Sequence, residues 1–149
     1  MPLKVEKIRN GTVIDHIRQG TAFSVLKILG VDSSYKEAVS VVMNAKSKKL
    51  GKKDIVKIEN RMLEKKEIDK ISLLSPDASV NIIKNSEVVE KHTVEVPDVI
   101  YDVLLCTNPD CITNHEDVET KFYVISKKPL DLRCHYCERL VNHLKFKIS

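Results

Sequence analysis

Four cysteines in the last third of the chain constrain its fold more than any other feature. Cys106 and Cys111 are separated by four residues, Cys134 and Cys137 by two, and the 149-residue chain has no other cysteine. Each close pair can present two thiolates to one metal ion once folding brings the pairs together. Four thiolates complete the tetrahedral shell of zinc and leave no position for a substrate water. We therefore expect one closed, structural zinc site.

Other interpretations of the cysteines are open. Iron also accepts four tetrahedral thiolates, and two disulfides could form in any of three pairings. Residues 1–10 (MPLKVEKIRN) are charged and contain no apolar segment of a secretory signal, so we expect a reducing cytoplasm, where disulfides are uncommon. Unpaired buried thiols would not explain two closely spaced pairs. Zinc is favoured, with iron second.

The charge of the chain is unevenly distributed. Residues 1–97 carry 18 Lys and Arg against 13 Asp and Glu, whereas residues 98–149 carry 7 against 8. A zinc module that clamps nucleic acid is expected to be basic. A nucleic-acid-binding zinc ribbon protein is therefore the alternative function that the charge disfavours, and we expect no nucleic acid partner. No apolar run approaches the ~20 residues of a membrane span, so we also expect a soluble protein without a membrane partner.

The first two thirds of the chain show the order strand, helix, strand, strand, helix, strand. Apolar residues at helical spacing (Ala22, Val25, Leu26, Leu29) follow a possible N-cap, Thr21, and Gly30 is a plausible stop. Strands are predicted over 12–17, 38–44, 54–60 and 79–83. Residues 87–96 continue the last strand or pair with it through a turn at 85–86. A second helix is predicted over 65–74 and a basic, hairpin-like loop over 46–53. This order is the split βαβ, ferredoxin-like pattern.

The sequence changes character at Pro97, where we place a boundary between domains 1–97 and 98–149. Short strands are predicted over 121–126, 130–133 and 140–148, the last with Leu144, Phe146 and Ile148 in phase. About 50 residues of this kind cannot bury a large core, so a metal is expected to stabilise them. The predicted fold class is α+β, with a ferredoxin-like domain followed by a small all-β zinc-binding domain.

Catalytic motifs are absent from the sequence. It contains no P-loop, no G-x-G-x-x-G, no H-E-x-x-H, no G-x-S-x-G and no zinc-deaminase signature. His115 and His135 lie near the cysteines, but with four thiolates available we expect both to be surface groups or supports of the ligands. His143 has no identifiable partner. We expect a protein that is not an enzyme.

Polar residues of the first domain are expected to converge on its sheet, because the first and third strands of a split βαβ sheet are central neighbours and the fourth lies beside the first. A carboxylate suits ribose hydroxyls and a lysine suits phosphate. From spacing alone, however, ordinary solvated side chains are the favoured interpretation. The residues concerned are Asp15, His16, Lys57, Asn81 and Lys91.

Several sequence motifs are more informative about function than this spacing. Residues 11–17 (GTVIDHI), 51–60 (GKKDIVKIEN) and 80–91 (VNIIKNSEVVEK) precede the C-x4-C and C-x-Y-C-E motifs of 106–111 and 134–138. In this order they resemble the regulatory chain family of aspartate carbamoyltransferase, over nearly the whole length. The resemblance implies a non-catalytic, allosteric subunit of pyrimidine biosynthesis. It also implies binding of nucleotide triphosphates such as CTP, ATP and UTP, pairing with a second regulatory chain through the first domain, and docking of the zinc domain on the catalytic chain.

Residue roles follow from the resemblance alone. The implied nucleotide ligands are Asp15, His16, Lys57, Asn81 and Lys91, with Ile8, Val13, Ile83 and Val88 lining the pocket. Lys91 and His16 would meet phosphates, Asp15 and Lys57 the ribose, and the backbone near Ile8 and Ser86 the base. Ser86 stands where relatives often have an aromatic residue, and His92-Thr93 where an arginine is common. Implied contacts to the catalytic chain are Asn108, Tyr136, Glu138 and Arg139.

Overall fold

The computed structural model describes residues 9–141 and 143–147, which form two compact units, Met1–Glu95 and Val96–Ser149. The first unit contains β1 (Gly11–Arg18), α1 (Ala22–Ile28), β2 (Val39–Ser47), β3 (Gly51–Glu59), α2 (Lys65–Leu74), β4 (Ser79–Lys84) and β5 (Glu87–Thr93). The second contains β6 (Val99–Tyr101), a 3-10 turn η1 (Ile112–Asn114), β7 (Lys121–Lys127), β8 (Leu130–Cys134) and β9 (Leu140–Val141). No described helix is long and apolar enough to cross a membrane.

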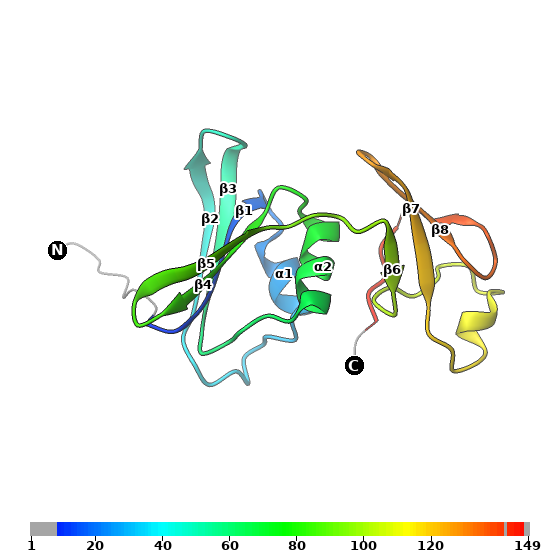
Figure 1. Ribbon diagram of the computed structural model, residues 1–149, viewed down its shortest axis with the longest axis horizontal. Coiled ribbons are helices and arrows are strands. Elements are labelled where there is room, and N and C mark those ends of the chain that lie inside the picture. The colour runs from blue at the N-terminus through cyan, green and yellow to red at the C-terminus, as the bar shows by residue number, and fades with distance from the viewer. Residues whose placement is uncertain (1–8, 142, 148–149) are drawn as a thin grey trace. The chain divides into compact units, whose positions relative to one another are not determined.

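The first unit is an antiparallel sheet of strand order β2-β3-β1-β4-β5, and α1 and α2 both lie on one of its faces (Figure 1). This arrangement confirms the predicted ferredoxin-like fold, extended by β5 at one edge. Alternation of apolar residues along the strands explains which face the helices cover, because side chains of a strand point to opposite faces in turn. The covered core comprises Ile14, Ile17, Ala22, Val25, Leu29, Val31, Val56, Ile58, Ile71, Ala78, Val80, Ile82 and Val94.

A buried carboxylate joins the start of α1 to the sheet. Asp54 is fully buried on β3, and its Oδ2 accepts hydrogen bonds from the backbone N–H groups of Gly20, Thr21 and Ala22 at 2.9, 3.2 and 3.2 Å. Its Oδ1 accepts a fourth from the N–H of Asn44 at 3.1 Å. The first N–H groups of a helix lack partners within the helix. The Asp54 carboxylate supplies an acceptor for these N–H groups from a distant strand. The N-cap residue, Thr21, makes no side-chain hydrogen bond to them.

The basic loop predicted over 46–53 is wrong in extent. Lys46 pairs with Lys52 and Ser47 with Gly51, so strands occupy most of this segment and the turn holds only 48–50. The Leu50 N–H donates to Ser47 Oγ at 3.1 Å, and Gly51 has a φ of 80°, which favours glycine. Lysine disfavours strands only weakly, and pairing across the hairpin overrides that preference.

The second unit is an antiparallel sheet of order β6-β7-β8-β9. The strand predicted over 140–148 is shorter in the structure, where β9 ends at Val141. It ends there because the chain after it pairs with the segment before Cys106. The Leu105 N–H donates to the Lys145 carbonyl at 2.7 Å, and Leu104 forms an isolated bridge with Phe146. Ile148, also predicted in this strand, lies outside the described residues.

Candidate functional site

The four cysteines form a closed cluster in the second unit. The Sγ atoms of Cys106 and Cys137 lie 3.7 Å apart, as do those of Cys111 and Cys134, and all four Sγ atoms lie within 4.8 Å of one another. Tetrahedral zinc with Zn–S bonds of about 2.3 Å places its sulfurs about 3.8 Å apart, whereas a disulfide needs about 2.05 Å. The cluster therefore fits zinc, and the cysteines are not joined as disulfides.

Backbone N–H groups of the two cysteine loops point at the sulfurs. The N–H of Asn108 donates to Cys106, and those of Tyr136 and Cys137 donate to Cys134. The hydroxyl of Thr113 donates to Cys111 Sγ at 3.2 Å. Such donors orient the ligands and stabilise negative charge on them. Cys106, Cys111 and Cys134 are also buried, and four thiolates complete the tetrahedral shell of zinc, so the chemistry of the site is structural.

The thiol pKa values differ across the cluster. Burial raises the pKa of Cys106 to about 12 and also raises the pKa of Cys134. For Cys137 burial acts in the same direction, but hydrogen bonds from the Asn108 side chain and the Arg139 N–H outweigh it, and the pKa falls to about 7. A thiol must lose its proton to bind zinc. Metal binding therefore releases protons and strengthens as the pH rises.

Neither histidine near the cysteines belongs to the cluster. His115 Nε2 donates to the Pro109 carbonyl at 2.8 Å, and His135 Nδ1 forms a hydrogen bond of 2.7 Å with the Tyr123 hydroxyl. In the described part of the chain, the group able to hold a metal contains the four cysteines and no histidine. His143 is exposed.

The implied nucleotide ligands of the first unit lie on the sheet face that the helices leave uncovered. Val13 pairs with Lys57 on one side and with Asn81 on the other, and Asn81 pairs with Lys91. Because directly paired residues of antiparallel strands point to the same face, these four side chains form one row across β3, β1, β4 and β5. We call this surface the open face. The row brings together residues that lie up to 78 positions apart in the sequence.

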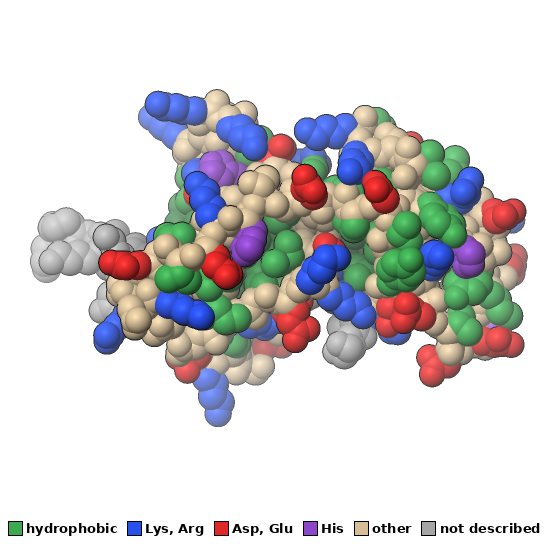
Figure 2. All heavy atoms as spheres, viewed as in Figure 1, with side chains coloured by type: hydrophobic (Ala, Val, Ile, Leu, Met, Phe, Trp, Pro, Cys, Tyr) green, Lys and Arg blue, Asp and Glu red, His purple; other side chains and the backbone are tan. Residues whose placement is uncertain are grey.

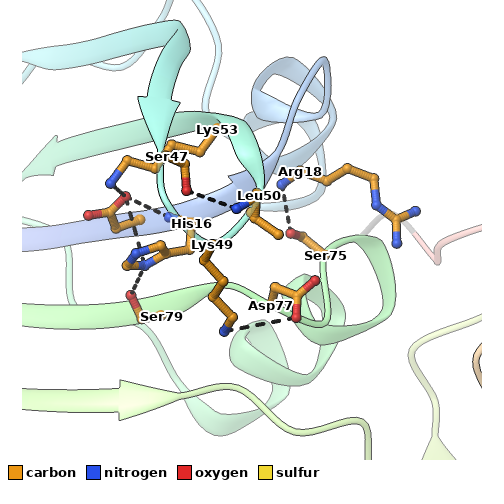
Figure 3. A network of polar contacts seen from close by, with 10 residues as sticks. His16, Arg18, Ser47, Lys49, Leu50, Lys53, Ser75, Asp77 and Ser79 are labelled. Carbon is orange, nitrogen blue, oxygen red and sulfur yellow. Dashed lines mark hydrogen bonds and ion pairs between the residues drawn. The ribbon is translucent and has the colours of Figure 1, made fainter.

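Asp15 and His16 adjoin this row at a bulge in β1. The register of β1 against β3 shifts by one residue between Ile14 and Ile17, and His16 has a φ of 55°. Lys53 Nζ lies 2.9 Å from Asp15 Oδ1, and His16 Nδ1 lies 3.2 Å from Ser79 Oγ (Figure 3). Lys53 was missed in the sequence, although it shares the phase of Lys57 on β3. Lys53 and Lys57 are four residues apart, which is twice the two-residue period of a strand, and this spacing is the signal that could have revealed Lys53.

The remaining nucleotide candidates lie at one end of the open face. Ile83 pairs with Val88 across the turn at Asn85 and Ser86; Ile83 is buried, whereas Val88 is exposed. Both turn residues have positive φ, and the Ser86 N–H donates to the Arg9 carbonyl at 2.8 Å. Ile8 lies outside the described residues.

Replacing Lys53 by methionine should raise the pKa of Asp15. Burial raises this pKa, but the hydrogen bond from Lys53, the hydrogen bond from the His16 N–H and the nearby charges outweigh it, so the folded pKa lies below 3.8. A lowered pKa stabilises the fold above the unfolded value, and this contribution is lost as the pH falls through the folded pKa. In the variant the loss should therefore occur at higher pH. Carboxyl-carbon NMR titration of Asp15 measures the shift.

Lys52→Met is the matched control for this titration, because Lys52 lies next along β3 and pairs with Lys46 instead of a carboxylate. It should leave the Asp15 titration in place. An Asp15 midpoint unchanged in Lys53→Met would contradict the assigned ion pair.

The four implied contacts to a catalytic chain lie in the cysteine loops. Tyr136, Glu138 and Arg139 are exposed, and the Tyr136 hydroxyl donates to the Glu119 carbonyl at 2.9 Å. Asn108 instead supports its own loop, since its carbonyl accepts the Cys111 N–H at 3.1 Å.

Together, the fold and the closed cysteine cluster define a two-domain protein that joins a ferredoxin-like domain to a structural zinc module. Family models agree: "Aspartate carbamoyltransferase regulatory chain, allosteric domain" matches residues 3–95, and the metal binding domain of the same chain matches residues 98–147. The chain belongs to the family of aspartate carbamoyltransferase regulatory chains. Its role is accordingly regulatory and not catalytic, and the family and the cluster fit one structural zinc ion per chain.

Similar proteins carry the same description. The aspartate carbamoyltransferase regulatory chain of Pyrococcus horikoshii is 58% identical over 138 residues, which cover 92% of this chain and 91% of the relative. That of Methanocaldococcus jannaschii is 53% identical over 145 residues, covering 97% and 96%. A regulatory chain implies a catalytic chain as its partner.

Proposed function

We propose that the first unit binds nucleotide triphosphates such as CTP, ATP and UTP on its open face, and that the zinc module relays this binding to the catalytic chain of aspartate carbamoyltransferase. The observation that carries the proposal is the row of Lys57, Val13, Asn81 and Lys91 across four strands, beside the Asp15–His16 bulge. It combines cations for phosphates, a carboxylate for ribose hydroxyls and an apolar floor on one surface.

Opposite ends of this row favour different parts of the ligand. Lys91, on the edge strand β5, is exposed and available to phosphate oxygens, and His16 stands on the same side of the sheet, held by Ser79. Asp15 and Lys57 lie on the central strands β1 and β3, where they suit the ribose. The base then occupies the end of the sheet at Ile83 and Val88, near the backbone of Ser86.

Assembly completes the proposal. The first domain, residues 1–97, pairs with that of a second regulatory chain, and the zinc domain, residues 98–149, docks on the catalytic chain through Asn108, Tyr136, Glu138 and Arg139 in the cytoplasm. Allosteric coupling is typically worth ~1–3 kcal/mol and is reciprocal for binding. The catalytic chain with bound substrate should therefore change nucleotide affinity by the same factor by which the nucleotide changes substrate affinity.

Calorimetric titration of CTP, ATP and UTP into the purified chain tests the nucleotide site. Lys91→Ala and Lys57→Ala should each weaken binding of at least one nucleotide by about tenfold to a hundredfold, because a hydrogen bond to a charged group contributes roughly 1.5–3 kcal/mol. The change in the dissociation constant is the measured quantity.

Two lysines outside the row serve as controls. Lys52→Ala on β3 and Lys84→Ala on β4 remove one positive charge each from strands that carry the row, yet their pairing partners lie outside it. Their dissociation constants should stay within about twofold of the wild type, since only long-range charge is altered. Equal losses in all four variants would indicate a general electrostatic effect, and no binding of any nucleotide to the wild type would refute the site.

A further inference from the structure

The sheet of the second unit has an unusual exposed side. Along β6, β7 and β8, one set of alternating residues is buried, among them Ile100, Phe122 and Leu132. The other set points away and pairs in two rows: Val99, Tyr123, Arg133 and Leu140 in the first, Tyr101 and Lys121 in the second. We call these six residues the outer face. An antiparallel sheet with one solvated side normally carries polar residues there, whereas four of these six are aromatic or aliphatic.

Cations of the outer face lie over its aromatic rings. Lys121 Nζ is 5.5 Å from the ring centroid of Tyr101 and 5.3 Å from that of Tyr123, and the Arg133 guanidinium carbon is 5.5 Å from Tyr123. These distances are those of cation–π contacts. They hold the cations against the sheet, so little side-chain entropy remains to be lost when a partner binds.

The outer face is open, and its two rows contain no acidic residue; Asp131, which has the same phase as Arg133 on β8, adjoins them. Tyr101 is 53% exposed and Leu140 68% exposed. No carboxylate of the described residues forms an ion pair with Lys121 or Arg133, and neither row contains Asp or Glu. Figure 2 shows green hydrophobic side chains over this unit, beside blue Lys and Arg, purple His and red Asp and Glu side chains. Exposed tyrosine and arginine with apolar neighbours are typical of the energetically dominant part of protein interfaces.

We infer that the outer face is a docking surface for an acidic segment of the catalytic chain, in addition to the cysteine loops. This inference rests on the proposed docking of the zinc module. The charge of Lys121 and Arg133 indicates the kind of partner, because cations that form no ion pair within the described residues attract carboxylates. Continuity supports it as well: the His135 ring contacts Tyr123 at 5.6 Å between centroids and Tyr136 at 5.1 Å, which joins the outer face to a loop already proposed to touch the catalytic chain.

A single-stranded nucleic acid would also meet aromatic rings and cations, but the surrounding module disfavours it. Residues 98–149 carry 7 basic and 8 acidic side chains, and a zinc ion with four thiolates adds further negative charge. The phosphates of a nucleic acid long enough to cross the outer face would be repelled by this net negative charge. An acidic protein segment engages the two cations locally.

The test measures binding of the full-length chain to the purified catalytic chain of the same organism by biolayer interferometry, with zinc content determined for every variant. Lys121→Glu and Arg133→Glu should each weaken binding by about tenfold or more, and the salt dependence of the affinity should become smaller. Leu140→Ser, at an exposed position where the fold tolerates change, should weaken it by severalfold. Lys145→Glu makes the same charge change on an exposed residue outside the two rows and should leave affinity within about twofold.

The outcomes separate this inference from the function on which it rests. Failure of the wild type to bind the catalytic chain overturns both. Wild-type binding that Lys121→Glu, Arg133→Glu and Leu140→Ser leave unchanged, with zinc retained, overturns the outer face alone. A fluorescent oligothymidylate added to the same proteins identifies the other occupant: if it binds the wild type and not Arg133→Glu while the affinity for the catalytic chain is unchanged, the face serves nucleic acid and the inference is wrong.

Discussion

Replacing Cys134 by serine should release the zinc ion and unfold the second unit while the first unit stays folded. Cys134 is 1% exposed at the end of β8, and its Sγ lies 3.7 Å from that of Cys111. Structural zinc contributes roughly 10–16 kcal/mol of apparent binding free energy in small zinc peptides at neutral pH, which exceeds what a core of about 50 residues supplies. Loss of residues that merely support ligands already costs ~10–100-fold in affinity, so loss of a ligand should cost more.

Zinc content per chain and amide NMR spectra measure this result. Signals of residues 98–149 should collapse to unfolded positions, and those of β1 to β5 should keep their dispersion, because the core of the first unit is built of its own side chains. Binding to the catalytic chain should be lost with the docking surface. Chelation of zinc from the wild type should reproduce the variant, and a complex that stays intact after complete metal removal would contradict the proposed role of the module.

Thr113→Val provides a graded control. It removes the hydroxyl that donates to Cys111 Sγ at 3.2 Å but keeps all four thiolates. Zinc should remain at one ion per chain, with affinity reduced by up to about tenfold. A folded, zinc-loaded Cys134→Ser chain would show that three thiolates suffice and that the site is not a closed four-thiolate centre.

The faces of the first sheet could be predicted from sequence because side chains alternate along a strand. Val56 and Ile58 differ in phase from Lys57, which indicates that the lysine leaves the core, and the structure agrees. The same reasoning could have identified Asp54. Asp54 shares the phase of Val56 and Ile58, so its carboxylate must point to the face of the sheet that packs on the core. A buried carboxylate there needs hydrogen-bond donors.

Local pairing details could not be predicted in this way. At the bulge, Asp15 and His16 of β1 lie opposite a single residue of β3. The sequence of one strand does not determine how it is aligned with its neighbour, so the bulge could not be predicted. The ending of β9 at Val141 depends on the competing pairing of 145–147 with 103–105, which is a tertiary contact. The cysteine spacing, by contrast, predicted the metal cluster directly, because tetrahedral coordination leaves few ways to arrange two short loops.

Asp54 connects the open face to the helical layer, although it lies on the opposite side of the sheet from the nucleotide candidates. It holds the Gly20–Ala22 turn directly after β1, and through Asn44 it holds the bulged end of β2. The strands that carry Asp15, His16 and Lys53 are therefore fixed at the same end by one side chain. A change at Asp54 should alter the site indirectly, through the geometry of β1.

Replacing Asp54 by alanine should destabilise the first unit by at least about 3 kcal/mol. Four backbone N–H groups lose their acceptor, and each buried donor left without a partner costs roughly 1–3 kcal/mol, less where water can reach it. A domain of this size is stable by about 5–15 kcal/mol, so the variant should remain folded but marginal. Urea denaturation, followed by NMR signals of β1 and β4 residues, measures the shift in midpoint.

Asp54→Asn and Asp32→Ala separate the cause from a general effect of removing charge. The asparagine keeps one acceptor oxygen of similar shape, so it should recover part of the loss. The Asp32 side chain, by contrast, is exposed and accepts hydrogen bonds from the N–H and the hydroxyl of Ser34. Replacing Asp32 should cost about 1 kcal/mol or less, because water can take the place of a hydrogen bond at an exposed turn. Equal destabilisation by Asp54→Ala and Asp32→Ala would mean that the buried carboxylate does not organise this end of the sheet. A larger loss for Asp54, accompanied by weaker nucleotide binding, would connect the fold of β1 directly to the proposed site.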